Sequence, residues 1–230
     1  MVAIRDPLRV EEHESEWEAA PAVTVVILLQ VLLAVVSKIE SWKLWHFVWW
    51  IWLLPIIAEL PLLVALAWHR PRRRLEQLGM RRTVAITLIG CVSLANAFLL
   101  VAVIASLVAG QERSGGQLLL KGFVVWTTNV IAFGLWYWAF DRGGPVGRRG
   151  PHPAKPDFQF PQMENPRLAP EHWQADLFDY VYVSFTNALA FSPTDAMPLS
   201  RWAKWLMLAE SATSAVTILL VAARAVNIFK

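Results

Sequence analysis

Five long apolar stretches alternate with polar connections along the chain. They cover residues 21–36, 44–68, 84–108, 118–140 and 202–228, and flanking residues lengthen the first of them. A helix needs about 20 apolar residues to cross the hydrocarbon core of a bilayer. The pattern therefore predicts five transmembrane helices. Residues 1–20 are polar and acidic, without a basic region ahead of a small-residue cleavage site, and they predict a tail rather than a signal peptide.

A different pattern separates the last two apolar stretches. Residues 176–188 predict a short aromatic helix, with Asp176 as its N-cap and Asp179 favourable in its first turn. Residues 189–197 are too polar for contact with lipid. Irregular backbone survives at membrane depth only where protein or a water-filled cavity shelters it. We therefore expect an all-α membrane protein with five transmembrane helices plus a re-entrant pore helix and loop before the last span.

The predicted elements fall into two groups after the tail 1–20. Residues 21–109 form a three-helix N-terminal membrane segment, whose second helix should kink at Pro55 and Pro61. The linker ahead of the pore helix is rich in Pro and Gly and should be extended. The second group is a pore-loop-like module at 118–228, with outer helix 118–140, linker 141–175, pore helix 176–188, filter-like loop 189–197 and inner helix 200–228.

Composition supports a membrane protein and argues against an enzyme. Of the 230 residues 56% are hydrophobic, which is too apolar for an ordinary soluble domain. Cys91 is the only cysteine, so the chain can form neither an internal disulfide nor a cysteine metal cluster. The five histidines have no metal-type spacing, and the sequence contains no phosphate-binding loop, nucleophile elbow or HExxH run. We expect no catalysis, no cofactor and no bound metal.

Basic residues gather on one side of the predicted topology. Fifteen of the 21 Lys and Arg residues fall on the side shared by the N-terminus, the loop 69–83, the linker and the filter-like loop. The positive-inside rule predicts that this side, and hence the N-terminus, is cytoplasmic in an inner or plasma membrane. Loop arginines of membrane proteins set orientation and contact lipid headgroups. The net charge of +3 therefore predicts contact with a lipid bilayer and not with nucleic acid.

The stretch AFSPTDAMPLSRWAKWL, residues 190–206, resembles the pore region of tetrameric potassium channels. That region runs TVGYGD, two residues, Pro, one residue, Ser or Thr, and then Trp-Gly/Ala-Arg/Lys. A gapless match places Asp195 on the acid after the filter and Pro198 on the proline. It also brings Ser200, Trp202 and Lys204 into register.

The following helix resembles the inner helix of two-helix bacterial channels. Glu210 falls where many of those helices carry glutamate, and Ser214 falls at their hinge glycine. The resemblance covers residues 118–228 and implies a homotetramer around a central pore. The architecture as a whole also resembles uncharacterised bacterial membrane proteins of a domain-of-unknown-function family.

The filter itself departs from the potassium-channel pattern. Ser192 and Thr194 occupy the glycine positions, and Pro193 replaces the tyrosine. Because Thr194 is β-branched, a positive φ there would be a genuine outlier. A ladder of dehydrated potassium sites is therefore not expected. Asp195 would instead contribute to a ring of four acids for monovalent cations, or it would brace the loop through Trp202 or backbone amides. The expected ion pathway consists of Leu189, Ala190, Phe191, Ser192, Pro193, Thr194, Asp195, Ser214 and Ile218.

Two acids lie inside predicted spans, where ionisable groups are expensive and often functional. Glu59 and Glu210 could each bind a proton or cation, or pair with a neighbouring helix. Polar residues of the third and fourth spans are expected to form interhelical hydrogen bonds worth about 1 kcal/mol or less each; they are Asn96, Thr127, Thr128 and Asn129. On the last helix a stripe of small residues suits close packing or a cavity lining: Ser211, Ser214, Ala215 and Ala222.

Three functions follow from these observations. The first is a homotetrameric channel-like protein with a degenerate, non-potassium filter and weakly selective cation permeation. The second is a non-conducting scaffold or regulatory subunit in which Leu189 and Phe191 plug the axis. The third is a small proton-coupled transporter that uses Glu59 and Glu210.

Overall fold

The computed structural model describes residues 19–42, 44, 46–110, 114–149, 154–167, 169–171, 173–192 and 196–228. These residues are mostly helical. Five helices are long and apolar enough to cross a membrane, which confirms the predicted number of spans and indicates a multi-pass membrane protein. They are Ala20–Ile39, Trp49–Ala67, Arg81–Val108, Gly115–Gly143 and Arg201–Ala223.

The second span is interrupted where the sequence predicted a kink. A 3-10 turn, η1 (Trp49–Leu53), is followed by α3 (Ile56–Ala67), and Pro55 lies at the break. Proline lacks the N–H that would continue the helix, and its ring clashes with the preceding turn. Pro61 lies inside α3. The spans on either side are α2 (Ala20–Ile39) and α5 (Arg81–Val108).

The arginine-rich loop 69–83 is more ordered than expected. It contains a helix, α4 (His69–Gln77), in which Arg72 is buried. Arg72 Nε donates to Glu76 Oε1 at 2.7 Å, an i,i+4 pair within the helix. The basic residues of this loop are therefore fixed to a helical surface beside the start of α5.

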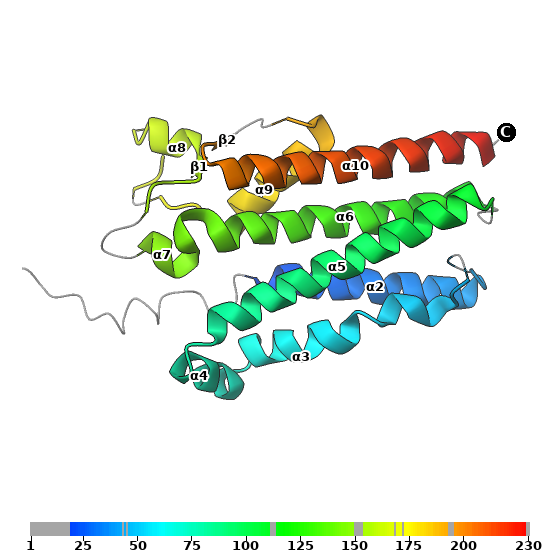
Figure 1. Ribbon diagram of the computed structural model, residues 1–230, viewed down its shortest axis with the longest axis horizontal. Helices are drawn as coiled ribbons and strands as arrows, with labels where there is room; N and C mark the ends of the chain where they lie inside the picture. The colour runs from blue at the N-terminus through cyan, green and yellow to red at the C-terminus, as the bar shows by residue number, and fades with distance from the viewer. Residues whose placement is uncertain are drawn as a thin grey trace, which may run out of the picture.

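Helix α6 (Gly115–Phe140) is the centre of the molecule. It packs against α2, α5, α9 (Leu177–Ala190) and α10 (Arg201–Ile228), and most of its length is buried. In Figure 1, α6 runs between α10 on one side and α5 and α2 on the other. The close approach of α9 depends on Gly134, since an added Cβ there would lie 2.9 Å from the Val181 Cα atom.

The Pro- and Gly-rich linker is not extended as expected. Its described residues form η2 (Asp141–Gly143), α7 (Pro145–Arg149), β1 (Phe158–Gln159) and α8 (Pro161–Glu164). Strand β1 pairs antiparallel with β2 (Met197–Pro198), with Phe158 opposite Pro198. The linker packs into the module because its aromatic side chains fill the core: Phe158 and Phe160 are both buried there.

Helix α9 begins at one end of the molecule and stops near its middle. Helices α4, α7 and α8 and both strands lie at that same end (Figure 1). Tyr180 of α9 contacts Asp141 at the end of α6, whereas Phe185 packs against Trp126, about 21 Å further along α6. The chain has returned to the first end by β2. The start of α9 and strand β2 therefore lie at the same end of the bundle.

Candidate functional site

The deepest polar cluster of the C-terminal module surrounds Glu210 on α10. Tyr137 of α6 donates its hydroxyl hydrogen to Glu210 Oε2 at 2.5 Å, and Asn187 Nδ2 of α9 donates to the same oxygen at 2.6 Å. Ser184 Oγ of α9 contacts Glu210 Oε1 and donates to the Val130 carbonyl oxygen at 2.7 Å. Both carboxyl oxygens thus have partners, and Glu210 is fully buried.

Hydrogen bonds from this Glu210 cluster fix the C-terminal half of α9 to α10. Asn187 Nδ2 also donates to the Met207 carbonyl oxygen at 3.0 Å, and Ser211 Oγ donates to Asn187 Oδ1 at 3.2 Å. One turn further along α10, Ser214 Oγ accepts a hydrogen bond from Asn129 Nδ2 of α6 at 3.2 Å. The predicted interhelical role of Asn129 is confirmed, and part of the small-residue stripe serves close packing.

The start of α9 is capped as the sequence predicted. Asp176 Oδ1 accepts from the Asp179 backbone N–H at 3.2 Å, and the Asp179 side chain accepts from the Asp176 N–H at 2.9 Å. This reciprocal capping box satisfies two of the free N–H groups at the helix start. The other end is closed by Phe191, which adopts the left-handed conformation with φ 54°.

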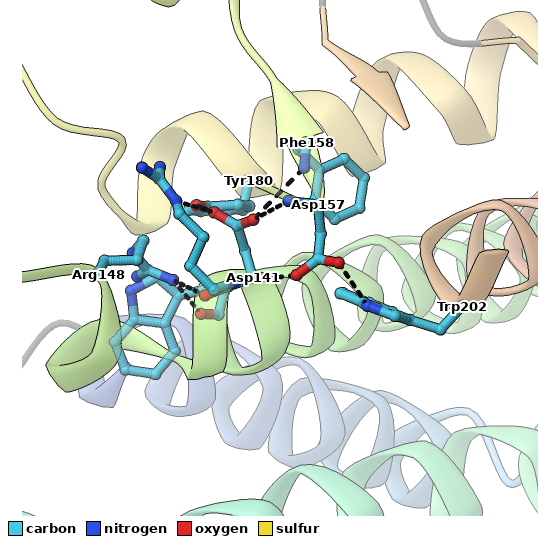
Figure 2. Close-up of polar contacts among 8 residues, drawn as sticks. Asp141, Arg148, Asp157, Phe158, Tyr180 and Trp202 are labelled. Atoms are coloured by element: carbon cyan, nitrogen blue, oxygen red, sulfur yellow. Dashed lines mark hydrogen bonds and ion pairs between the residues drawn. The ribbon is translucent and has the colours of Figure 1, made fainter. Parts of the chain in front are cut away.

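A second polar cluster, centred on Asp141, joins the linker to three helices (Figure 2). Asp141 Oδ1 accepts from the Asp157 backbone N–H at 2.8 Å, and its Oδ2 accepts from the Tyr180 hydroxyl at 2.5 Å. Asp157 Oδ1 in turn accepts from the Trp202 indole N–H of α10 at 2.8 Å. This Asp141 cluster therefore ties the ends of α6, α9 and α10 to β1. The ring of Phe158 packs edge-to-face against Tyr180 and Trp202, with ring centroids 6.2 and 5.8 Å apart.

A buried arginine completes the Asp141 cluster. Arg148 Nη1 donates to the Trp138 carbonyl oxygen at 2.6 Å, and its guanidinium lies 5.0 Å from the Tyr180 ring centroid. Burial is the main cause that raises the pKa of Tyr180, while the nearby Arg148 charge opposes that rise. The phenol consequently keeps its proton and remains a hydrogen-bond donor to Asp141.

The turn after α6 depends on unusual backbone conformations. Arg142 has φ 52°, and its backbone N–H donates to Asp157 Oδ2 at 3.0 Å. Gly144 follows with φ 94°, and a Cβ there would lie 2.8 Å from the Ala139 carbonyl oxygen. This position favours glycine because other residues rarely adopt positive φ.

The residues predicted for the ion pathway are only partly described. Leu189 and Phe191 are 55% and 48% exposed at the end of α9, and Ala190 and Ser192 are exposed as well. Pro193, Thr194 and Asp195 lie outside the described residues. The Trp202 N–H, one expected partner of Asp195, donates to Asp157 Oδ1.

Two predicted pathway residues of α10 face α6 of the same chain. Ser214 is fully buried against Asn129. Ile218 is half-buried on the wall of an apolar cleft of about 230 Å³ between α6 and α10, together with Phe123 and Trp126. Ser214 and Ile218 thus both contact α6 of their own chain. The residues that line the cleft present mainly apolar groups.

The second predicted acid, Glu59, is not part of either cluster. It is fully buried on α3, where its Oε1 accepts from Gln30 Nε2 of α2 at 3.2 Å. Its Oε2 has no protein partner among the described residues. Within that part of the chain no three His, Cys, Asp or Glu side chains gather into a metal site.

Sequence reasoning missed Asp141, Asp157 and Tyr137 as the organising polar residues of the module. The available signal was weak: an acid directly after an apolar helix, and a second acid beside the aromatic residues of the linker.

Comparisons with known protein families, curated proteins and solved structures found no match. The function of this chain is therefore inferred from its own geometry.

Proposed function

We propose that α9 and the loop after it form a re-entrant pore helix and pore loop, and that the chain is a homotetrameric, channel-like membrane protein. The observation that carries the proposal is the position of the last turn of α9. Asn187 in that turn hydrogen-bonds to Met207, and the exposed residues Leu189 to Ser192 follow directly. Met207 lies about 9 Å along α10 from Arg201.

Backbone at that depth requires shelter. The last carbonyl groups of a helix have no partner within the helix, and unsatisfied groups cost several kcal/mol each in lipid. A single chain leaves the end of α9 open. Symmetry-related copies around a water-filled axis would both cover this end and hydrate it.

The outer face of α9 supports contact with other copies. Its exposed side chains are all apolar or aromatic and recur at intervals of three or four residues, so they form one stripe: Phe178, Tyr182, Phe185 and Leu189. Such a stripe on a half-length helix suits a neighbouring subunit. The proposed permeant species are monovalent cations, drawn to Asp195 at the mouth without the dehydration sites of a potassium filter. The end that carries α4 would face the cytoplasm.

A non-conducting scaffold is the second candidate, and one observation favours it. The apolar side chains of Leu189 and Phe191 are exposed where α9 ends, and in a tetramer they could close the axis. The transporter hypothesis lacks comparable support, because Glu59 contacts α2 whereas Glu210 contacts α6 and α9.

Two measurements test the proposal. Native mass spectrometry in detergent should give a tetramer, and a cation-flux assay in liposomes should give flux that Asp195→Asn reduces while Glu164→Gln, an exposed acid on α8, does not. A stable monomer would overturn the re-entrant pore. A tetramer without flux would select the scaffold, and flux of potassium with strong rejection of sodium would contradict the filter argument.

A further inference from the structure

Three buried polar side chains lie on the inner faces of the N-terminal helices. Gln30 of α2, Glu59 of α3 and Asn96 of α5 are 2%, 0% and 3% exposed. Helix α3 packs against both α2 and α5, and Glu59 contacts Gln30 of α2. None of these residues takes part in the Glu210 cluster or the Asp141 cluster.

The apolar core indicates that all three lie at one depth. Two separate apolar clusters fill the bundle, and along its own span each polar residue falls between a residue of one cluster and a residue of the other. On α2 the flanking pair is Val26 and Leu33, and on α5 it is Val92 and Leu99. In the second span Glu59 follows Trp52 of η1 and precedes Leu62 and Leu63 of α3. The polar side chains therefore form a single layer between two apolar halves.

This layer contains more acceptors than donors. Gln30 Nε2 donates to Glu59 Oε1 at 3.2 Å. The remaining oxygens, Gln30 Oε1, Glu59 Oε2 and Asn96 Oδ1, have no protein partner among the described residues. A buried acceptor without a donor is expensive, and a buried carboxylate without a counter-charge is more so.

Among the residues that the structure describes, no lysine or arginine forms an ion pair with Glu59. Lys38 lies two turns beyond Gln30 on α2, with its ammonium 5.0 Å from the Trp49 ring centroid, and Arg81 and Arg82 begin α5 at its other end. On α6, Lys121 is buried beside Leu118, within the apolar half that contains Leu33 and Leu99.

We propose that Gln30, Glu59 and Asn96 bind a dehydrated monovalent cation of sodium size through their three free oxygens. Carboxylate and amide oxygens are the ligands that hard cations prefer. One carboxylate matches one positive charge, whereas a divalent ion would leave a net charge in the apolar core. A water molecule would not neutralise the carboxylate charge. A proton on Glu59 Oε2 could be donated to one of the two amide oxygens and would leave the other without a partner. This proposal does not depend on the pore.

Thermal unfolding of the purified full chain in detergent tests the proposal. Tryptophan fluorescence is followed in sodium chloride and in N-methyl-D-glucamine chloride of equal ionic strength. Sodium should raise Tm by about 5–10 °C at a concentration about 100 times its dissociation constant. Glu59→Gln should abolish the sodium-dependent rise, and Asn96→Leu should reduce it.

The readout is the sodium-dependent difference within each variant, so a general loss of stability does not imitate the expected result. Glu164→Gln provides the matched control and should retain the full rise. Equal Tm values in the two salts for the unsubstituted chain, or a full rise in Glu59→Gln, would overturn the proposal. Stabilisation by acid with no effect of sodium at any pH would show that a proton alone occupies the layer, and would overturn it too.

Discussion

Glu59 and Glu210 are the same residue type, equally buried, in two halves of one membrane protein, yet their surroundings differ. Glu210 has three partners from two helices, and both of its oxygens are satisfied. Among the described residues, Glu59 has one partner, and one oxygen of Glu59 and one of Gln30 have none. The difference indicates that the C-terminal acid locks helices together, whereas the N-terminal acid leaves capacity for a ligand.

Helix packing also differs between the two halves: it is tighter around Gly134 in the C-terminal module than around Gly90 in the N-terminal half. In the C-terminal module, α9 approaches α6 so closely that Gly134 has no room for a Cβ. In the N-terminal half, an added Cβ at Gly90 of α5 would meet no heavy atom within 4 Å. At these two glycines, the helices of the C-terminal module, which positions α9, are therefore more closely packed than those of the N-terminal half.

The largest expected effect comes from emptying the Glu210 cluster. Glu210→Ala leaves Tyr137 and Asn187 without their shared acceptor, removes the contact of Ser184 and opens a cavity, so it should lower the free energy of unfolding by about 3–5 kcal/mol. Equilibrium unfolding in mixed detergent micelles measures this change. An effect below about 1 kcal/mol would mean that the cluster does not lock α9.

The second largest effect is expected where α9 packs closely against α6. Gly134→Ala should cost about 1–3 kcal/mol, because the new methyl group would overlap the Val181 backbone and move α9 outward. Gly90→Ala is the matched control and should be neutral or slightly stabilising, since alanine favours a helix. Equal effects of the two substitutions in the same unfolding assay would remove the contrast in packing.

A smaller effect is expected at the Asp141 cluster. Tyr180→Phe removes one of several donors to Asp141 and should cost about 1 kcal/mol. Because burial raises the pKa of Tyr180 above that of the unfolded chain, its contribution is complete below about pH 10 and declines at higher pH. Unfolding measured at pH 7 and at pH 10.5 should show the gap between the two proteins narrowing. A gap that widens at pH 10.5 would contradict the protonated phenol.

The smallest effect should come from Glu59→Gln in sodium-free buffer. The substitution removes a charge that has a single amide donor, so the free energy of unfolding should change by less than about 1 kcal/mol in either direction. Unfolding in N-methyl-D-glucamine chloride measures this value. A loss as large as that of Glu210→Ala would show that Glu59, too, is a structural lock, and the comparison would fail.

Much of the fold follows from local signals. Apolar length predicted the five spans, proline chemistry predicted the break at Pro55, and Asp176 with Asp179 predicted the start of α9. Each of these features depends on neighbouring residues along the chain. The prediction of an extended linker was wrong because the linker's conformation depends on distant residues. Its proline content indicated an extended segment, whereas Phe158 is buried among helices far away in the sequence.

The sequence by itself determined which segments are apolar enough for a bilayer, where they break and how α9 is capped, because these properties arise within a few turns of one chain segment. Only the tertiary structure decided that Glu210 is satisfied and Glu59 is not, and that Asp141 joins the linker to three helices. Hydrogen-bond partners 16 to 73 residues apart make that difference, and no local pattern encodes which side chains meet across a bundle.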